Sequence, residues 1–466
     1  MNAKNLLWVA GALGIAALPL PGLAQETTAA ATEAVVTGNY ADKSEMEFVL
    51  NTFSFLMCGA LVMWMAAGFA MLESGLVRSK NTASICLKNV ALFAIACIMY
   101  YLIGYSLMYA DVDGGYIGSF AIFYNLGDAE AVLLGAEEQT ADLISAVTDN
   151  GYSVMSDWFF QVVFVATAAS IVSGTLAERI RIWPFFIFVA VLTGIIYPIQ
   201  GAWTWGGGWL AEMGFSDFAG STIVHSVGGW AALSGAIILG PRRGKYGPDG
   251  TMHPMPGSNL PLATLGTFIL WLGWFGFNGG SELALGTAAN ATNMSIVFAN
   301  TNLAACGGVM AAIILTQILY GKIDLTMALN GAIGGLVAIT ANPALQHSML
   351  AIIVGAIGAV LVVFAVPIID KLKIDDVVGA ISVHLVAGIW GTLAVAIFGG
   401  GDFTAQITGI VAIGAFVFIA SSIVWLILKF TVGIRTDEEE ETIGLDKAEL
   451  GQEAYPEFGQ GARSIG

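Results

Sequence analysis

Two histidines occupy matching positions in two similar segments of the chain. His225 stands in VHSVGGWAAL eight residues after Asp217, and His384 stands in VHLVAGIWGTL eight residues after Asp376. A neutral imidazole carries one hydrogen-bond donor and one acceptor, and its ordinary pKa of about 6.5 allows proton exchange near neutral pH. The two rings are therefore candidates for a proton relay.

Both histidines lie within apolar runs, where ionisable residues are costly and usually face a pathway. Burial favours the neutral rings, so the two could share one hydrogen between their nitrogens. A satisfied core histidine is the alternative for either ring alone, but matching positions favour a function. Metal binding is a further alternative, yet two histidines without a nearby cysteine or carboxylate give too few ligands for a usual site. We expect neither a metal nor a cofactor.

The composition places these residues in a membrane. Of 466 residues, 57% are hydrophobic and 11% are charged, with a mean hydropathy of +0.78, whereas soluble domains carry about 25% charged residues. Eleven apolar stretches are long enough to cross about 30 Å of hydrocarbon, which predicts an all-α polytopic membrane protein. The stretches are 48–72, 88–110, 155–176, 183–203, 219–240, 260–280, 296–319, 325–344, 347–369, 380–400 and 405–432.

The first 25 residues resemble a cleaved signal peptide, with Lys4, a short apolar run and then two prolines. The alternative is a retained twelfth helix, but the run is short for a span. The predicted organisation is a signal peptide over 1–25, an extracytoplasmic segment over 26–47, an eleven-helix membrane domain over 48–432 and a cytoplasmic tail over 433–466.

In this predicted topology, the Lys and Arg residues fall in connections on one side of the membrane. Positive side chains collect in cytoplasmic connections, and the segment 111–157 instead carries nine acidic residues and no Lys or Arg. This pattern predicts a multi-pass protein of the bacterial inner membrane, with the mature N-terminus outside and the C-terminus in the cytoplasm. The net charge of -17 comes largely from that segment and from 437–441, so it implies no nucleic-acid partner.

The two histidine segments run in opposite directions in this topology, so the sequence predicts an inverted repeat of helices one to five and six to ten. Eight residues of helix rise about 12 Å, so each histidine should approach the centre of the membrane, where the two rings should meet.

At this point the chain resembles the Amt branch of the Amt/Rh superfamily of ammonium transporters, over roughly residues 45 to 455. The motifs that carry the resemblance are GFAMLESGLVRSKN from Gly68, SGTLAERIR from Ser173, WGGGWLAEMGFSDFAGSTIVH ending at His225, GWFGFNGGSELAL from Gly273, and DDVVGAISVHLVAGIWGTLAVAIF from Asp375.

The resemblance implies a function for particular residues of this chain. It implies an external ammonium site, a gate of stacked phenylalanines and a twin-histidine pore, with ammonium or methylammonium as substrate. The substrate-binding residues would be Trp205, Phe164, Ser281 and, as a support beneath them, Asp217; the gate would be Phe164 and Phe277; the pore would be lined by His225, His384, Trp274 and Thr340.

Physical chemistry favours these residue types. Aromatic faces attract a cation by roughly 0.5 to 2 kcal/mol, and a serine hydroxyl can accept a hydrogen bond from ammonium but not from potassium. Moving a bare ion into hydrocarbon costs tens of kcal/mol by Born estimates. We therefore expect ammonium to lose its proton near the gate and to cross as ammonia. The proton would follow separately, and passive ammonia conduction is the alternative.

The tail also resembles that of the family. From composition alone it reads as a charged, partly flexible segment. The resemblance implies a homotrimer whose tails pack on neighbouring subunits, and a PII-type regulatory protein as a possible partner besides membrane lipid. The acidic segment 111–157 is interpreted as a solvated cap rather than as a cation collector.

Three other functions compete with transport. An ammonium sensor on the same fold would normally need an output domain, and a tail of about 34 residues is too short for one. A membrane enzyme is not expected, because only the two histidines could serve as catalytic groups. A passive gas channel of the Rh branch is the nearest rival, but Trp205 and Ser281 favour the Amt branch.

Overall fold

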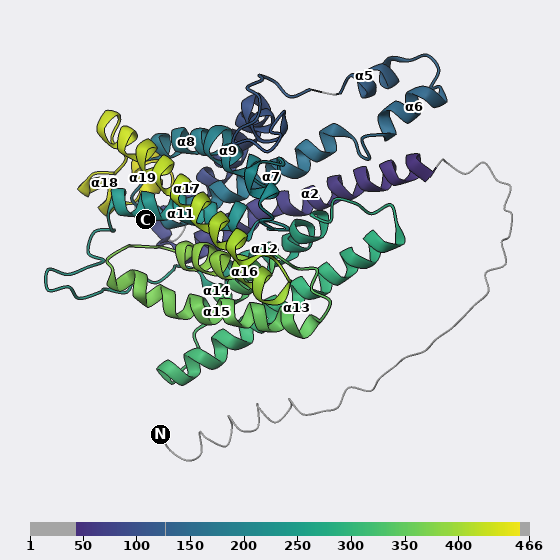
Figure 1. The fold of residues 1–466 in the computed structure, drawn as a ribbon. Coiled ribbons are helices and arrows are strands. Elements are labelled where there is room, and N and C mark those ends of the chain that lie inside the picture. Colours follow the sequence, from purple (N-terminus) through teal and green to yellow (C-terminus); the bar gives the residue numbers. More distant parts are fainter. Residues whose placement is uncertain (1–42, 126, 457–466) are drawn as a thin grey trace, which may run out of the picture. The chain divides into compact units, whose positions relative to one another are not determined.

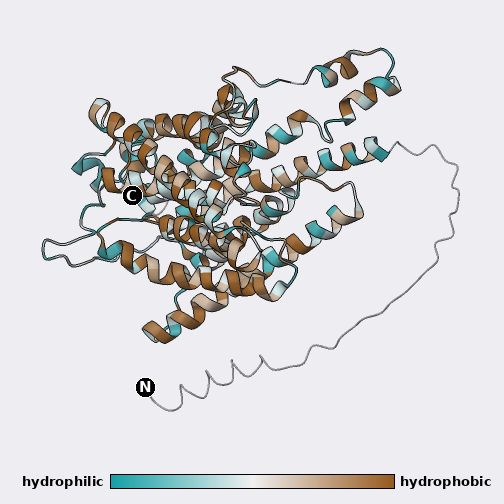
Figure 2. Ribbon diagram, in the orientation of Figure 1, coloured by the Kyte–Doolittle hydropathy of each residue, from teal (hydrophilic) through white to brown (hydrophobic). Residues whose placement is uncertain are grey.

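The computed structural model describes residues 43–125 and 127–456. The predicted signal peptide and most of the segment 26–47 lie outside the described residues. The described part is almost entirely helical (Figure 1). Ten of its helices, some built of consecutive helical pieces, are long and apolar enough to cross a membrane, and hydrophobic residues dominate most of their length (Figure 2).

The helices follow one another along the chain, and the longest connections between them precede α5 and α12. In chain order they are α2 (Lys43–Leu76), η2 (Ser79–Asn81), α3 (Thr82–Met99), η3 (Tyr100–Gly104), α4 (Tyr105–Tyr109), α5 (Asp128–Gly135), α6 (Ala141–Thr148), α7 (Val154–Thr175), α8 (Ile182–Val191), η4 (Leu192–Ile196), α9 (Tyr197–Ala202), α10 (Trp209–Glu212), η5 (Ser221–Ser226), α11 (Val227–Leu239), α12 (Leu260–Gly280), α13 (Ala288–Tyr320), α14 (Leu325–Ile339), α15 (Ser348–Lys371), η6 (Ile381–Val386), α16 (Ala387–Phe398), α17 (Phe403–Thr431), α18 (Glu438–Ile443) and α19 (Leu445–Leu450).

The predicted number of eleven spanning helices is not confirmed. The predicted span 325–344 corresponds to α14, which has 15 residues. At 1.5 Å per residue such a helix is about 22 Å long, which is shorter than a hydrocarbon core of about 30 Å. Its last twelve residues are all buried, and it packs between α13 and α15. The prediction of a polytopic helical membrane fold is confirmed, and α14 is its one short apolar helix among the described residues.

Small residues allow the longest helices to pack closely. The most extensive contact between two helices joins α2 and α12. A Cβ atom placed on Gly266 of α12 would lie 2.3 Å from the backbone nitrogen of Leu72 in α2. Only glycine permits this approach, and close backbone contact is how membrane helices gain packing energy. This contact fixes α12, which carries several of the predicted site residues.

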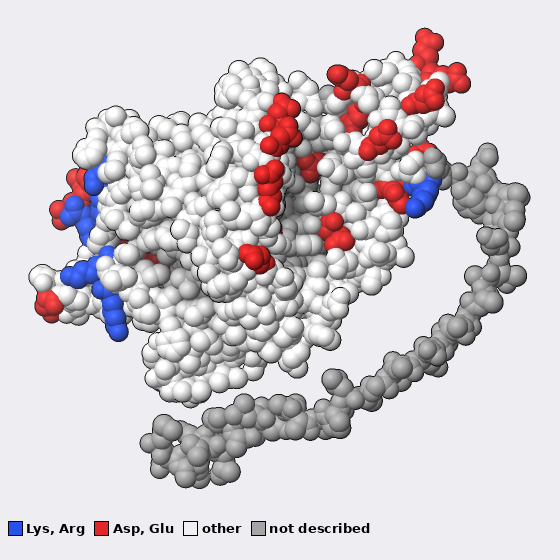
Figure 3. Space-filling view, viewed as in Figure 1, with Lys and Arg blue, Asp and Glu red and all other residues white. Residues whose placement is uncertain are grey.

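The acidic segment between α4 and α7 contains two short helices, α5 and α6. Glu130 of α5 is buried, and its carboxylate accepts a hydrogen bond of 2.9 Å from the backbone nitrogen of Val154 at the start of α7. The segment is therefore anchored to α7. Figure 3 shows that Asp and Glu side chains gather over this segment, whereas most Lys and Arg side chains on the visible face gather near α18.

The tail folds through residue 456 instead of remaining a flexible segment. Asp437 and Glu440 form a capping box at the start of α18. Asp446 of α19 accepts hydrogen bonds of 2.9 and 2.7 Å from the backbone nitrogens of Ala83 and Ser84 in α3. Lys80 donates to the carbonyl of Glu441 at 2.8 Å. The tail thus packs against η2 and the start of α3. The sequence had predicted a partly flexible segment instead.

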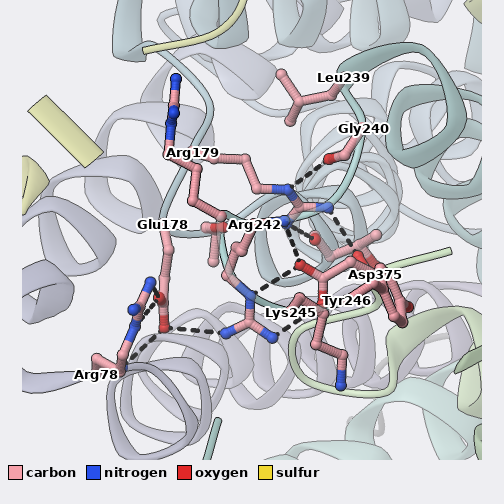
Figure 4. Close-up of polar contacts among 12 residues, drawn as sticks. Arg78, Glu178, Arg179, Leu239, Gly240, Arg242, Lys245, Tyr246 and Asp375 are labelled. Atoms are coloured by element: carbon pink, nitrogen blue, oxygen red, sulfur yellow. Dashed lines mark hydrogen bonds and ion pairs between the residues drawn. The ribbon is translucent and has the colours of Figure 1, made fainter. Parts of the chain in front are cut away.

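A buried ion-pair network joins distant connections on the side of the tail (Figure 4). Arg242 donates to both carboxylate oxygens of Asp375 at 2.9 Å, and lies 3.3 Å from Glu178, which also pairs with Arg78. Burial alone would raise the pKa of Asp375, but Arg242 and Arg179 hold that pKa well below its usual value. The carboxylate is therefore ionised, and Arg242 links it through Glu178 to Arg78.

We expect Asp375→Asn to lower the free energy of unfolding by about 3 kcal/mol, because the substitution leaves the Arg242 guanidinium buried with a weakened partner. The midpoint of thermal denaturation in detergent measures this loss. Lys43→Ala, which removes an exposed pair with Glu47, is the control and should leave the midpoint unchanged. Because the pKa of Asp375 is lowered, its contribution is present above the ordinary value of 3.8 and is lost only as the pH falls below it.

Candidate functional site

Asp217 organises the start of the helix that carries His225. Its carboxylate accepts hydrogen bonds of 2.8 to 3.1 Å from the backbone nitrogens of residues 220 to 223. Gly220 has a φ of 105°, a conformation that favours glycine, and it turns these amides toward the carboxylate. Burial raises the pKa of Asp217 although the amides oppose this. Helix η5 begins only at Ser221, so the helix between Asp217 and His225 is shorter than the sequence argument assumed.

The second histidine segment is built in the same way. Asp376 accepts hydrogen bonds of 3.0 and 2.8 Å from the backbone nitrogens of Ala380 and Ile381, and Gly379 has a φ of 82°. Burial raises the pKa of Asp376 to about 6. Helices η5 and η6 are both six-residue π-helical turns, and His225 is the fifth residue of η5 whereas His384 is the fourth residue of η6. The repeated spacing in the sequence therefore corresponds to a repeated local structure.

The two histidine rings meet inside the protein. The Nδ1 atoms of His225 and His384 lie 3.2 Å apart, and both residues are buried. Such a bond requires complementary tautomers, because one Nδ1 must carry the hydrogen that the other accepts. The Nε2 atom of His225 is buried without a hydrogen-bond partner. Each neutral ring has one nitrogen that can donate and one that can accept a hydrogen bond, and the two rings contact each other through their Nδ1 atoms.

Aromatic side chains pack against one side of the histidine pair. The ring centroids of Phe164 and Phe277 lie 4.2 Å apart, and Phe277 lies 5.2 Å from His225 at an interplanar angle of 23°. Trp274 stacks on His225 at 4.9 Å and donates from Nε1 to the hydroxyl of Thr340 at 2.8 Å. The tryptophan and threonine predicted to line the pore are therefore bonded to each other beside the histidines.

A cavity of about 340 Å³ lies on the other side of the phenylalanine pair. We call it the vestibule. Its lining residues are Tyr105, Tyr109, Tyr152, Asp157, Phe160, Gln161, Phe164, Trp205, Phe218, Ser281 and Leu283.

The vestibule brings together three of the four predicted substrate-binding residues. Trp205 meets Phe164 edge to face, with ring centroids 6.0 Å apart. The hydroxyl of Ser281 donates to the carbonyl of Phe277 at 2.8 Å, so its oxygen lone pairs are free to accept. Asp217 does not line the vestibule, but its carbonyl oxygen accepts a hydrogen bond of 3.0 Å from Trp205 Nε1. It holds the indole rather than facing a ligand.

Sequence reasoning missed part of this arrangement. Phe160 lies one helical turn before Phe164, and their ring centroids are 4.8 Å apart. The ring centroid of Phe69 lies 6.3 Å from that of His384. Tyr105 and Asp157 also line the vestibule. The spacing of Asp157, Phe160 and Phe164, at intervals of three and four, indicates one helical face and was the available signal.

The apolar spanning helices, with a histidine pair buried among them, define a multi-pass α-helical membrane protein. A model of the Ammonium Transporter Family matches residues 53–455, which is most of the chain. The chain belongs to the ammonium transporter family, as the motifs had predicted.

Individual relatives agree with this membership. The chain is 39% identical over 447 residues to ammonium transporter Amt2 of Archaeoglobus fulgidus, covering 89% of this chain and 90% of that protein. It is 38% identical over 418 residues to a putative ammonium transporter of Synechocystis sp., with coverage of 88% and 90%. Among solved structures, "Sensor Amt Protein" has a TM-score of 0.78 at 37% identity, with coverage of 87% and 99%. Candida albicans Mep2 has a TM-score of 0.72 at 27% identity, with coverage of 86% and 89%.

Proposed function

We propose that this protein recruits ammonium in the vestibule, removes its proton near the phenylalanine pair, and conducts ammonia past His225 and His384. One observation carries the proposal: the two imidazoles lie 3.2 Å apart, buried, with Phe277 stacked between the vestibule and His225. A neutral molecule can pass such an apolar region, whereas a bare ammonium ion would need compensation of tens of kcal/mol.

The residues of the vestibule suit recruitment of a cation. The faces of Phe164 and Trp205 attract positive charge, and the Ser281 oxygen can accept a hydrogen bond from an ammonium N–H. Potassium has the same charge but no hydrogen to donate. The vestibule therefore selects by hydrogen bonding as well as by charge.

The released proton follows a separate route along the histidine pair. An imidazole that accepts a proton on one nitrogen can release one from the other, which passes charge without moving a hydrated ion. Transport is then electrogenic. Passive conduction, in which the proton stays outside, is the alternative that a current measurement separates.

A sensor function is the second candidate. The observation that favours it is the likeness to the solved structure titled "Sensor Amt Protein". Such a protein would bind ammonium in the same vestibule without sustained flux. Steady uptake through the purified protein distinguishes transport from sensing.

We also propose the bacterial inner membrane as location, with the vestibule outside and the tail in the cytoplasm. The separation of acidic and basic side chains along the visible face supports this orientation. Assembly as a homotrimer and binding of a PII-type protein at the tail remain proposals that rest on family membership.

Uptake of methylammonium into cells lacking their own transporter tests the proposal. Trp205→Ala should lower uptake about tenfold at low substrate concentration, because the substitution removes a cation-attracting face. Trp183→Ala is the matched control, since Trp183 is 74% exposed on α8 and should leave uptake unchanged. Equal uptake by all three proteins contradicts the proposed recruitment site.

A further inference from the structure

Asp157 is a buried carboxylate in the wall of the vestibule. It lies in the first turn of α7 and is only 6% exposed. Gln161 donates to its Oδ1 atom at 3.2 Å, and the hydroxyl of Tyr105 donates to its Oδ2 atom. Donors at both oxygens favour the ionised form of a carboxylate. All of these donors are neutral, so they do not balance its charge.

No basic side chain of the described residues forms an ion pair with Asp157. The surrounding stretch of sequence is also without basic residues, since no Lys or Arg occurs between Lys88 and Arg179. A buried charge without a partner is unfavourable, and proteins normally pair such charges. A cation that enters the vestibule can supply the missing positive charge, because Asp157 lines that cavity.

The neighbouring side chains fit a cation of the ammonium type. Tyr105, Tyr109 and Tyr152 line the vestibule together with Asp157, and the rings of Tyr105 and Tyr109 lie 5.0 Å apart. Aromatic faces around a carboxylate attract alkylammonium ions, which are less strongly hydrated than small metal cations. The cavity volume of about 340 Å³ accommodates such an ion with water.

Asp157 lies at some distance along α7 from the phenylalanine pair, Phe164 and Phe277. Asp157 and Phe164 lie on one face of α7, seven residues apart, which corresponds to about 10 Å along the helix. The carboxylate thus lies two turns from the phenylalanine pair, toward the α5–α6 segment.

We propose that Asp157, with Tyr105, Tyr109 and Tyr152, forms a second cation subsite in the vestibule, which takes ammonium or a monoalkylammonium ion before Trp205 and Phe164 do. The inference rests on the proposed transport function and adds a residue that sets apparent affinity. Because the subsite holds the ion outside the gate, its loss should raise the half-saturation concentration more than it lowers the maximal rate.

The experiment measures uptake of methylammonium by proteoliposomes over a range of concentrations. Asp157→Asn keeps the shape and one acceptor but removes the charge, and it should raise the half-saturation concentration about tenfold, the scale of one charge-assisted contact. Asp157→Glu keeps the charge and should stay within about threefold of the native value. Asp142→Asn removes an exposed charge from the same acidic segment and should have no effect.

An unchanged half-saturation concentration in folded Asp157→Asn protein overturns the subsite, as does an equal rise in the asparagine and glutamate variants. Should the asparagine variant fail to fold, Tyr152→Leu carries the test with an expected rise of about threefold, and no rise there also overturns the subsite. Failure of the proposed function looks different, because the native protein itself would then show no saturable uptake.

Discussion

Asp217→Ala is expected to lower methylammonium uptake by about 100-fold, because each buried amide that loses its acceptor is unfavourable by about 1–3 kcal/mol. Four backbone nitrogens at the start of η5 bond to this carboxylate. The same residue holds the Trp205 indole through its carbonyl oxygen. The substitution keeps that carbonyl but leaves the four amides without their acceptor. It should therefore displace the start of the helix that carries His225 and, through the shifted backbone of residue 217, the Trp205 indole.

The control for this variant is another aspartate that begins a helix. Asp402 accepts a hydrogen bond of 2.7 Å from the backbone nitrogen of Ala405 at the start of α17, and it is exposed and does not line the vestibule. Asp402→Ala should reduce stability by about 1 kcal/mol, as for an ordinary N-cap, and leave uptake near the native rate. Equal losses in the two variants, measured at equal amounts of folded protein, would count against a special role for Asp217.

Replacement of either His225 or His384 by leucine is expected to lower the ammonium-dependent current by about 100-fold, because an apolar side chain would interrupt the proton route that we propose along the histidine pair. The 3.2 Å contact between His225 and His384 means that loss of one ring also removes the partner of the other. The current is measured on liposomes that contain the purified variant.

His347→Leu provides the matched control. This histidine is exposed at the start of α15 and makes no side-chain cap hydrogen bond, so its loss should not change the current. A native current in both His225→Leu and His384→Leu would mean that the proton takes another route.

The histidine pair shows how much the sequence alone could predict. The repeated spacing from aspartate to histidine lies within each motif, so it predicted that two similar segments would carry equivalent rings. The spanning helices could also be predicted from local sequence. A helix that crosses the lipid must have a certain length and an apolar composition, and both are visible in the hydropathy of its own residues. Helix α14 is apolar but shorter than a spanning helix. Its apolar residues are buried against other helices, so its length does not need to match the thickness of the membrane.

Contacts between distant residues that lie outside the repeated and family motifs could not be predicted. Asp157 seemed to be the last residue of an acidic solvated segment, and only the fold brings it beside Tyr105, 52 residues earlier. The ion pairs of Arg242 join residues 64 and 133 positions away. The tail was predicted to be partly flexible because its composition is charged, whereas the carboxylate of Asp446 accepts hydrogen bonds from two backbone amides of α3, which no local sequence pattern indicates.

The central claim is that the proton and ammonia cross separately, through a region that rejects the intact cation. The most direct test is the current carried by the native protein in liposomes after a pulse of ammonium, compared with an equal pulse of potassium. We expect a current with ammonium and none with potassium. Equal currents with both ions, or no ammonium-dependent current in a preparation that takes up methylammonium, would contradict it.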